Sequence, residues 1–417
     1  MQDKISETYP LRIYTGILLL LALLLGGFQT KDQGNSSADG RAGSARENAA
    51  AHLSEEGDDN ADVFSLHLFH SLIQQKNLRN QLVPPLLVAL TLSALSEGAN
   101  GATRAEILKV LRQTPQTIAE FNKSNLEILS DIQKLPKPHE VHVARSFWID
   151  HSKTVNADFV ARVTGTFGAS YQQMQAGSDG AVKQVNGWFS QAMGGTAPPV
   201  VKSIPSNDQF FTLDAISYTG SWAAEFRSMG YLQFKLHTGD STAHTMMYRE
   251  GNFEYFEDEF LQAVRLPYQK SDLVLELYLP RDPKGIFSVS KYIRPSTWMK
   301  WQAAFAKKAG TVILPIFSFS SRVTMPEVLA QMGIQTAFHP QGADFKGIFE
   351  IGNTRVGNMV FATFYKTTTE GAAIPFSAKT IAGKGFNMRV NHPFFYVVRH
   401  TRLNRIVIMG TVIVPKD

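Results

Sequence analysis

The chain contains no cysteine, and this absence removes several classes of chemistry at once. Without thiols there is no disulfide framework, no cysteine nucleophile and no thiolate-bound metal centre. The 11 histidines are dispersed along the chain instead of clustering at the spacing of metal ligands. We therefore expect no metal site.

The short motifs that mark common enzymes are also missing. There is no Gly-x-Ser-x-Gly elbow, no Gly-rich loop that ends in Lys-Ser or Lys-Thr, and no His-Glu-x-x-His pair. A Gly-Lys-Gly at Gly383–Gly385 lacks the strand-to-helix context of a dinucleotide-binding loop. The sequence thus predicts no catalytic residues, no cofactor and no enzymatic activity.

Residues 1–30 contain the one long hydrophobic run. Lys4 and Arg12 precede an apolar stretch, Ile17–Leu25, which is short for a membrane span and typical of a secretory signal peptide. We expect a secreted protein. A signal anchor formed by residues 13–30, with the rest of the chain outside the cell, is the alternative because no clear cleavage site follows. In an exported chain, Asn35 and Asn122 are candidate glycosylation acceptors.

Residues 31–61 are polar and contain no aromatic side chain, so we expect a disordered tail. This segment carries three Lys or Arg and seven Asp or Glu, a net charge of −4, while residues 1–30 are neutral. Because the whole chain has a net charge of +5, residues 62–417 carry 5 + 4 = +9. We expect these residues to form a single folded domain with a basic surface.

A basic surface attracts polyanions. A weak heparin-like partner is therefore expected, with five scattered candidate contacts: Lys76, Arg79, Arg104, Lys109 and Arg112. These cations lack the interleaved aromatic side chains of a nucleic-acid platform, and no nucleic-acid partner is expected.

Helical and strand patterns occupy different parts of the domain. Apolar residues recur at helical spacing in "DVFSLHLFHSLIQQ", and the proline pair of "VPPLLVALTLSALSEGA" can open a buried helix. Later runs are rich in β-branched and aromatic residues, as in "AVRLPY", "LVLELYLP", "TVILPIFSFS", "NMVFATFYK" and "RIVIMGTVIVP". This segregation predicts an α+β fold with a largely antiparallel sheet.

Six segments of the domain are similar, in order and spacing, to segments of the serpin family. They are "LSEGANGATRAEILKVL", "LDAISYTGSWAAEF", "MMYREGNFEY", "LPYQKSDLVLELYLP", "ADFKGI" and "VNHPFFYVVRHTRLNRIVIMGTVIVP". The resemblance implies a monomer with three β-sheets, about nine helices and an exposed reactive loop before the C-terminal strands. It also implies an inhibitor that traps a serine endopeptidase, or alternatively a cysteine endopeptidase, when the cleaved loop inserts into the main sheet.

The resemblance places the reactive loop within "KTTTEGAAIPFSAKTIAGKGF", Lys366 to Phe386. One register matches Glu370 and Gly371 to the family's acidic-Gly hinge, and Ala372 and Ala373 to its run of small residues. Another register matches Thr369 and Glu370 to a later Thr-Glu of the family and loses the hinge glycine. The candidate scissile region contains Lys379 and Lys384, which suit a trypsin-like protease, and Ala382 and Gly383, which suit an elastase-like protease.

The hinge departs from the family pattern at three consecutive residues, Ile374, Pro375 and Phe376. In an inserted strand, Pro375 removes a ladder donor and Phe376 is larger than the small side chains of the family. These departures favour an alternative function as a non-inhibitory carrier, chaperone or scaffold. A hydrolase or lectin unrelated to serpins is a third, weaker alternative.

The region where the family's main sheet opens also departs from the pattern. By position, the polar residues of the family are replaced here by Pro84, Leu87, Asp214 and Phe361, and Trp222 matches a tryptophan where the loop begins to insert. Apolar replacement of a whole hydrogen-bonded network can stabilise a closed sheet. Simple repacking of the core, without a functional consequence, is the alternative.

Overall fold

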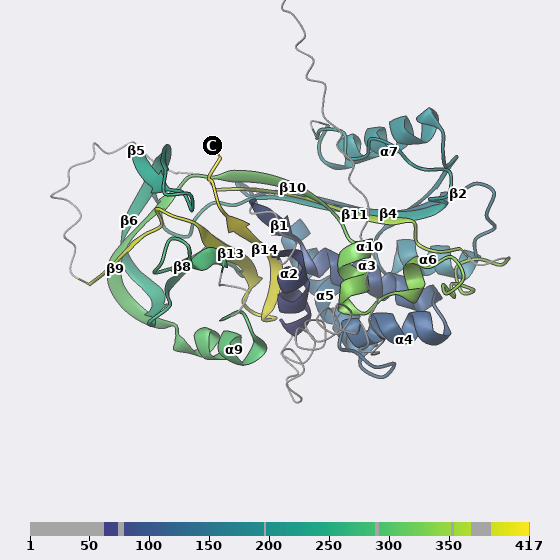
Figure 1. Cartoon of the computed structure of the whole chain (residues 1–417), viewed down its shortest axis with the longest axis horizontal. Helices are drawn as coiled ribbons and strands as arrows, with labels where there is room; N and C mark the ends of the chain where they lie inside the picture. Colours follow the sequence, from purple (N-terminus) through teal and green to yellow (C-terminus); the bar gives the residue numbers. More distant parts are fainter. Residues whose placement is uncertain are drawn as a thin grey trace, which may run out of the picture. The chain divides into compact units, whose positions relative to one another are not determined.

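Eight α-helices and two hydrogen-bonded β-sheets make up the described residues of this computed structural model. The structure describes residues 62–73, 79–195, 197–287, 292–351, 354–367 and 385–416. All of them belong to one unit of the chain, His52–Asp417 (Figure 1). The predicted signal segment and polar tail lie outside the described residues. Within the described residues, no helix is both long enough and apolar enough to cross a membrane.

The helices, numbered as in Figure 1, are α2 Val63–Ile73, α3 Pro85–Gly98, α4 Gly101–Val110, α5 Ile118–Gln133, α6 Ala157–Gly165, α7 Asp179–Ala192, α9 Pro295–Ala304 and α10 Pro326–Met332. Short 3-10 helices occupy Gly285–Phe287 and Thr336–Phe338. The expected helices in the first part of the domain are confirmed, since α3 opens at the proline pair and every residue except Glu97 is buried.

The smaller sheet has five strands in the order β10 Ser318–Thr324, β11 Asn358–Lys366, β4 Phe210–Thr219, β2 Glu140–Asp150 and β3 Ser170–Met174. Helix α7 covers one face of this sheet, and α3, α5 and α6 lie on the other (Figure 1). Phe189 of α7 belongs to a separate core cluster with Phe211 and Leu213 of β4. Because both faces are covered, β4 is buried along almost its whole length instead of alternating between buried and exposed residues.

The larger sheet has nine strands. Its order is β1 Gln81–Val83, β14 Arg405–Val412, β13 Phe394–His400, β8 Leu273–Pro280, β7 Leu261–Pro267, β6 Ser241–Glu257, β9 Ala306–Pro315 and β12 Phe386–Arg389, and β5 Arg227–Lys235 pairs with β6 outside this order. The long strand β6 pairs with β5 along its first half, with β9 from Met246 to Tyr255, and with β7 at its end. It thereby joins two strand groups into one sheet, where the family resemblance implied separate sheets.

The α+β prediction is confirmed, but the segregation of helices from strands is incomplete. Strands β2 and β3 lie among the early helices, and α9 and α10 lie among the late strands. Three strand pairs are parallel, β4 with β11, β2 with β3, and β9 with β12. The run "TVILPIFSFS", expected as one strand, divides at Pro315 into β9 and β10, which belong to different sheets. A proline ends a ladder readily because it has no N–H to donate.

Candidate functional site

Strands β4 and β11 meet in the centre of the five-stranded sheet, where the sequence predicts insertion of the reactive loop. They run parallel and pair along their length, from Asn358 opposite Phe211 to Lys366 opposite Thr219. We call this paired length the β4–β11 seam. The sheet is therefore closed at the seam in this structure.

The chain leaves β11 at a well-defined point. The backbone N–H of Thr367 donates to the Phe317 carbonyl at 2.9 Å, and the Phe317 N–H donates to Oγ1 of Thr367 at 2.8 Å. The chain returns at Gly385 and enters β12 beside β9. Residues 368–384 lie outside the described residues. They contain the predicted hinge, Glu370 to Phe376, and the predicted scissile region, Lys379, Ala382, Gly383 and Lys384.

A buried ion pair lies beside the middle of the seam. Asp214 of β4 is paired in register with Phe361 of β11 on one side and with Arg145 of β2 on the other. The Arg145 Nε donates to Oδ1 of Asp214 at 3.1 Å, and both side chains are almost completely excluded from water. Arg145 was not anticipated from the sequence. A single charge within the apolar run "VARSFWI" was the available signal.

The surroundings of this pair disfavour its charges. Burial raises the pKa of Asp214 to about 6, although the neighbouring Arg145 and Thr91 oppose the shift. Burial also lowers the pKa of Arg145. Desolvation of a buried ion pair can exceed the attraction between its charges. The pair therefore specifies how β2 and β4 align without contributing much stability.

Helix α3 lies beneath the seam and carries two predicted residues. Pro84 caps the start of α3, where its carbonyl accepts hydrogen bonds from Leu87 and Val88 at 3.0 and 3.1 Å. Leu87 has no exposed surface and belongs to the same core cluster as Phe361. The structure thus places Asp214 and Phe361 opposite each other in the seam, with Leu87 buried in the same core as Phe361 and Pro84 at the start of the helix that carries Leu87.

The end of the seam where β4 and β11 both finish is packed with aromatic side chains. The hydroxyl oxygens of Tyr268 and Tyr365 lie 2.5 Å apart, and the Trp222 ring stacks on Tyr268 at 4.8 Å between centroids. Tyr218 of β4 meets the Tyr268 ring edge-on at 5.1 Å, and its hydroxyl lies 3.4 Å from Nδ1 of His139. We call these five residues the tyrosine cluster. Of them, only Trp222 was predicted from the sequence.

Hydrogen bonding defines the protonation of this cluster. The Nε2 of His139 lies 2.7 Å from the Gln269 carbonyl oxygen, which can only accept, so Nε2 carries the proton. In the neutral ring, Nδ1 then accepts from the Tyr218 hydroxyl. Burial raises the pKa of Tyr218, Tyr268 and Tyr365, which keeps the phenols protonated as hydrogen-bond donors.

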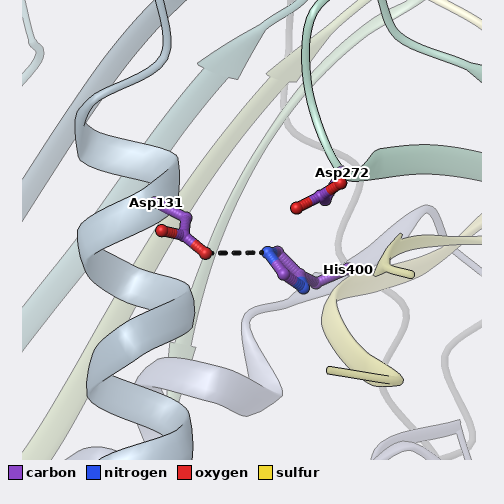
Figure 2. Close-up of side chains that lie close together, drawn as sticks. All are labelled: Asp131, Asp272 and His400. Carbon is purple, nitrogen blue, oxygen red and sulfur yellow. Dashed lines mark ion pairs between the residues drawn. The ribbon is translucent and has the colours of Figure 1, made fainter. Parts of the chain in front are cut away.

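A second group of polar side chains, Asp131, Asp272 and His400, lies close together elsewhere in the fold, between α5, the start of β8 and the end of β13 (Figure 2). The Nε2 of His400 lies 3.3 Å from a carboxylate oxygen of Asp131. The Leu403 N–H donates to Nδ1 of His400 at 3.3 Å, so the neutral ring carries its proton on Nε2 and offers no lone pair there. Arg402 also pairs with both carboxylates, at 2.5 Å and 3.2 Å. In this structure the group forms an ion-pair network with Arg402.

Comparison with known proteins identifies the family. The sequence model of the family described as serpin (serine protease inhibitor) matches residues 59–415. The chain therefore belongs to the serpin family. The resemblance seen in the sequence is confirmed.

Among curated proteins, the chain is 25% identical to the leukocyte elastase inhibitor of Equus caballus over 367 residues, covering 83% of this chain and 96% of that protein. It is also 25% identical to antithrombin-III of Homo sapiens over 377 residues, covering 84% and 80% respectively.

Solved structures of the same fold include proteins with different names. Uncleaved ovalbumin matches with a TM-score of 0.75 at 20% identity, covering 84% of this chain and 98% of ovalbumin. Thyroxine-binding globulin in complex with thyroxine matches with a TM-score of 0.76 at 19% identity, covering 86% and 98%. At these identities the likeness establishes the fold alone.

Proposed function

We propose that this serpin inhibits a serine endopeptidase as a suicide substrate. The observation that carries the proposal is the parallel pairing of β4 with β11 at the centre of the five-stranded sheet. Because these strands are parallel, a chain that leaves β11 at Thr367 and folds back between them runs antiparallel to both. One parallel ladder is then replaced by two antiparallel ladders, which are slightly more stable per residue.

The mechanism uses this difference in stability to trap the protease. The protease's own serine attacks a bond within residues 368–384 and remains attached as an acyl-enzyme. Insertion of the freed segment then displaces and distorts the attached protease before water can release it, so the stored strain of the uncleaved form drives inhibition. The inhibitor contributes a substrate and a sheet that opens, and no catalytic group of its own.

The proposed partner is a trypsin-like or elastase-like enzyme. Lys379 and Lys384 suit the former, and Ala382 and Gly383 suit the latter. Similarity to a protein named leukocyte elastase inhibitor supports the elastase-like option. A cysteine endopeptidase is the second class to test. We also propose that the inhibitor acts as a monomer and that a heparin-like polyanion binds weakly to its basic surface.

We propose that the protein acts outside the cell, either after cleavage of residues 1–30 or anchored by residues 13–30. Of the two candidate glycosylation sites, Asn122 has only 8% of its surface exposed within α5, so a glycan has little room there. Asn35 lies outside the described residues and remains the better candidate.

A non-inhibitory role as a carrier, chaperone or scaffold is the second candidate. One observation that favours it is the tyrosine cluster, whose buried contacts stabilise the closed seam where β4 and β11 finish. The other is the presence of Ile374, Pro375 and Phe376 in the predicted hinge. Both features oppose insertion of a strand.

One experiment separates the two functions. The protein is incubated with trypsin and with elastase, and the products are examined by denaturing gel electrophoresis and by thermal melting. An inhibitor gives a covalent complex that survives SDS, and its loop-cleaved form melts at a much higher temperature. Cleavage with neither complex nor increased melting temperature contradicts inhibition and supports the carrier class.

A further inference from the structure

We propose that a basic groove at the end of the five-stranded sheet where β4 and β11 finish binds a small polyanion that carries phosphate or sulfate groups. The groove has a volume of about 790 Å³. Its cationic lining is Arg79, Arg322, Lys366 and Lys416, with His237 beside them. These five residues come from five separate parts of the chain and meet only in the folded protein.

Among the described residues, nothing compensates the charge of the groove. No described Asp or Glu lines it, and none of its four Lys and Arg side chains pairs with a described carboxylate. The Arg322 Nε donates to the Val200 carbonyl, which holds this guanidinium in place. Like charges gathered in a hollow repel one another and raise the local potential, and a bound anion relieves both effects.

The neutral lining also suits an oxyanion. Ser217, Thr219, Ser320 and Ser321 are among the residues that line the groove, and none of their hydroxyls hydrogen-bonds to another described side chain or backbone group. Hydroxyl donors, lysines and the planar fork of arginine together match the several oxygens of a phosphate or sulfate. The volume lies in the range of small-molecule sites, so the proposed ligand is a compact molecule and not a polymer.

The groove spans the β4–β11 seam. Ser217 and Thr219 of β4 lie opposite Phe364 and Lys366 of β11, and all four line it. Neighbouring strands are about 4.8 Å apart, so an inserted strand would increase this separation to roughly 9.6 Å. A ligand that contacts both strands therefore binds the closed sheet preferentially and, by reciprocity, disfavours the inserted form at equilibrium. Because the two strands must separate before the loop can enter, the bound ligand also slows insertion. This coupling rests on the proposed inhibitory function, whereas ligand binding does not.

Binding is tested with inorganic tripolyphosphate as the phosphate probe and sucrose octasulfate as the sulfate probe, each titrated into the full chain by calorimetry at constant ionic strength. The test variant is Lys366→Ser/Lys416→Ser. Its matched control is Lys134→Ser/Lys307→Ser, which removes the same charge from exposed positions outside the groove. We expect single-site binding of at least one probe, weakened about tenfold or more in the test variant and less than about twofold in the control.

Two results would overturn the site: no binding of either probe to the parent protein, or an equal loss of affinity in both double variants, which would indicate diffuse attraction to the surface. A separate measurement tests the coupling, namely the rate of SDS-stable complex formation with and without a saturating probe. We expect a slower rate with the probe, and an unchanged rate overturns the coupling. If no protease forms a complex, the proposed inhibitory function fails, while the titration still decides the site.

Discussion

The hydroxyl oxygens of Tyr268 and Tyr365 lie 2.5 Å apart, although the two residues are separated by 97 positions in the sequence. Tyr365 belongs to β11, and Tyr268 follows directly after β7 in the other sheet. The hydrogen bond therefore joins one side of the β4–β11 seam to the larger sheet. Because both residues are buried, the bond is shielded from competition with water.

Removing one of these hydroxyls should destabilise the protein. In Tyr268→Phe or Tyr365→Phe, the remaining buried hydroxyl loses its partner, and the free energy of unfolding should fall by about 1 to 3 kcal/mol. The double variant should lose less than the sum of the two single losses, because no unpaired hydroxyl remains. Urea unfolding measures all three values, with Tyr231→Phe as the control because Tyr231 is 72% exposed. Strict additivity would show that the hydrogen bond is energetically unimportant.

The buried pair of Arg145 and Asp214 should behave asymmetrically on mutation. Arg145→Leu leaves a buried carboxylate without its cation and should lower the free energy of unfolding by about 3 to 5 kcal/mol at neutral pH. Arg145→Leu/Asp214→Leu removes both charges and should recover most of that loss. Chemical denaturation of both variants provides the measurement. A double variant less stable than the single variant would mean that the pair itself stabilises the domain.

The same pair predicts a pH dependence. The pKa of Asp214 is about 6 in the folded protein and 3.8 as its ordinary value, so the folded state holds this proton more tightly. The contribution of Asp214 to stability is therefore greatest below about pH 4 and is lost as the pH rises towards 6. Without Arg145 the pKa of Asp214 in the folded protein rises further, so the loss of unfolding free energy in Arg145→Leu should be smaller at acid pH. A loss that stays constant between pH 4 and 7 would contradict a raised pKa of Asp214.

Changing the hinge should alter the outcome of a protease attack. With Ile374, Pro375 and Phe376 in place, we expect the protein to be cleaved mostly as a substrate, because slow insertion loses the race against hydrolysis. Changing all three to Ala restores the ladder donor and removes the large side chains, so the fraction of SDS-stable complex should increase. The comparison uses trypsin and elastase at equal molar ratios. A parent that already traps protease at near one-to-one stoichiometry would show that these residues do not hinder insertion.

Phe394 should be a major contributor to the core. Its side chain has no exposed surface, and its ring packs edge-on against Phe317 at 5.7 Å between centroids. Phe394→Ala should lower the free energy of unfolding by roughly 3 to 5 kcal/mol because it leaves a cavity. Phe260→Ala is the matched control, since 43% of the Phe260 surface is exposed, and it should cost much less. Similar losses in the two variants would mean that packing at Phe394 is looser than the structure indicates.

Local pattern was sufficient to predict several elements of the fold. The apolar run "LVLELYLP" is β8 with the bounds expected from the sequence, and "NMVFATFYK" is β11. The proline pair marks the start of α3 for a local reason, because proline is well suited to the first turn of a helix. The order and spacing of six segments were also sufficient to identify the family, which a family-wide comparison confirms.

The candidate site depended on contacts that no local pattern contains. Alternation along a strand predicts which residues share a face, but not which strand lies beside it. Only the folded register places Arg145 next to Asp214, 69 positions away, and only burial makes that charge pair costly. The tyrosine cluster and the basic groove arise in the same way, from distant segments whose side chains meet at one end of the sheet. The sequence by itself determined several strands, the first helices and the family. The tertiary structure decided which charges and hydroxyls are neighbours, because that depends on strand order and register.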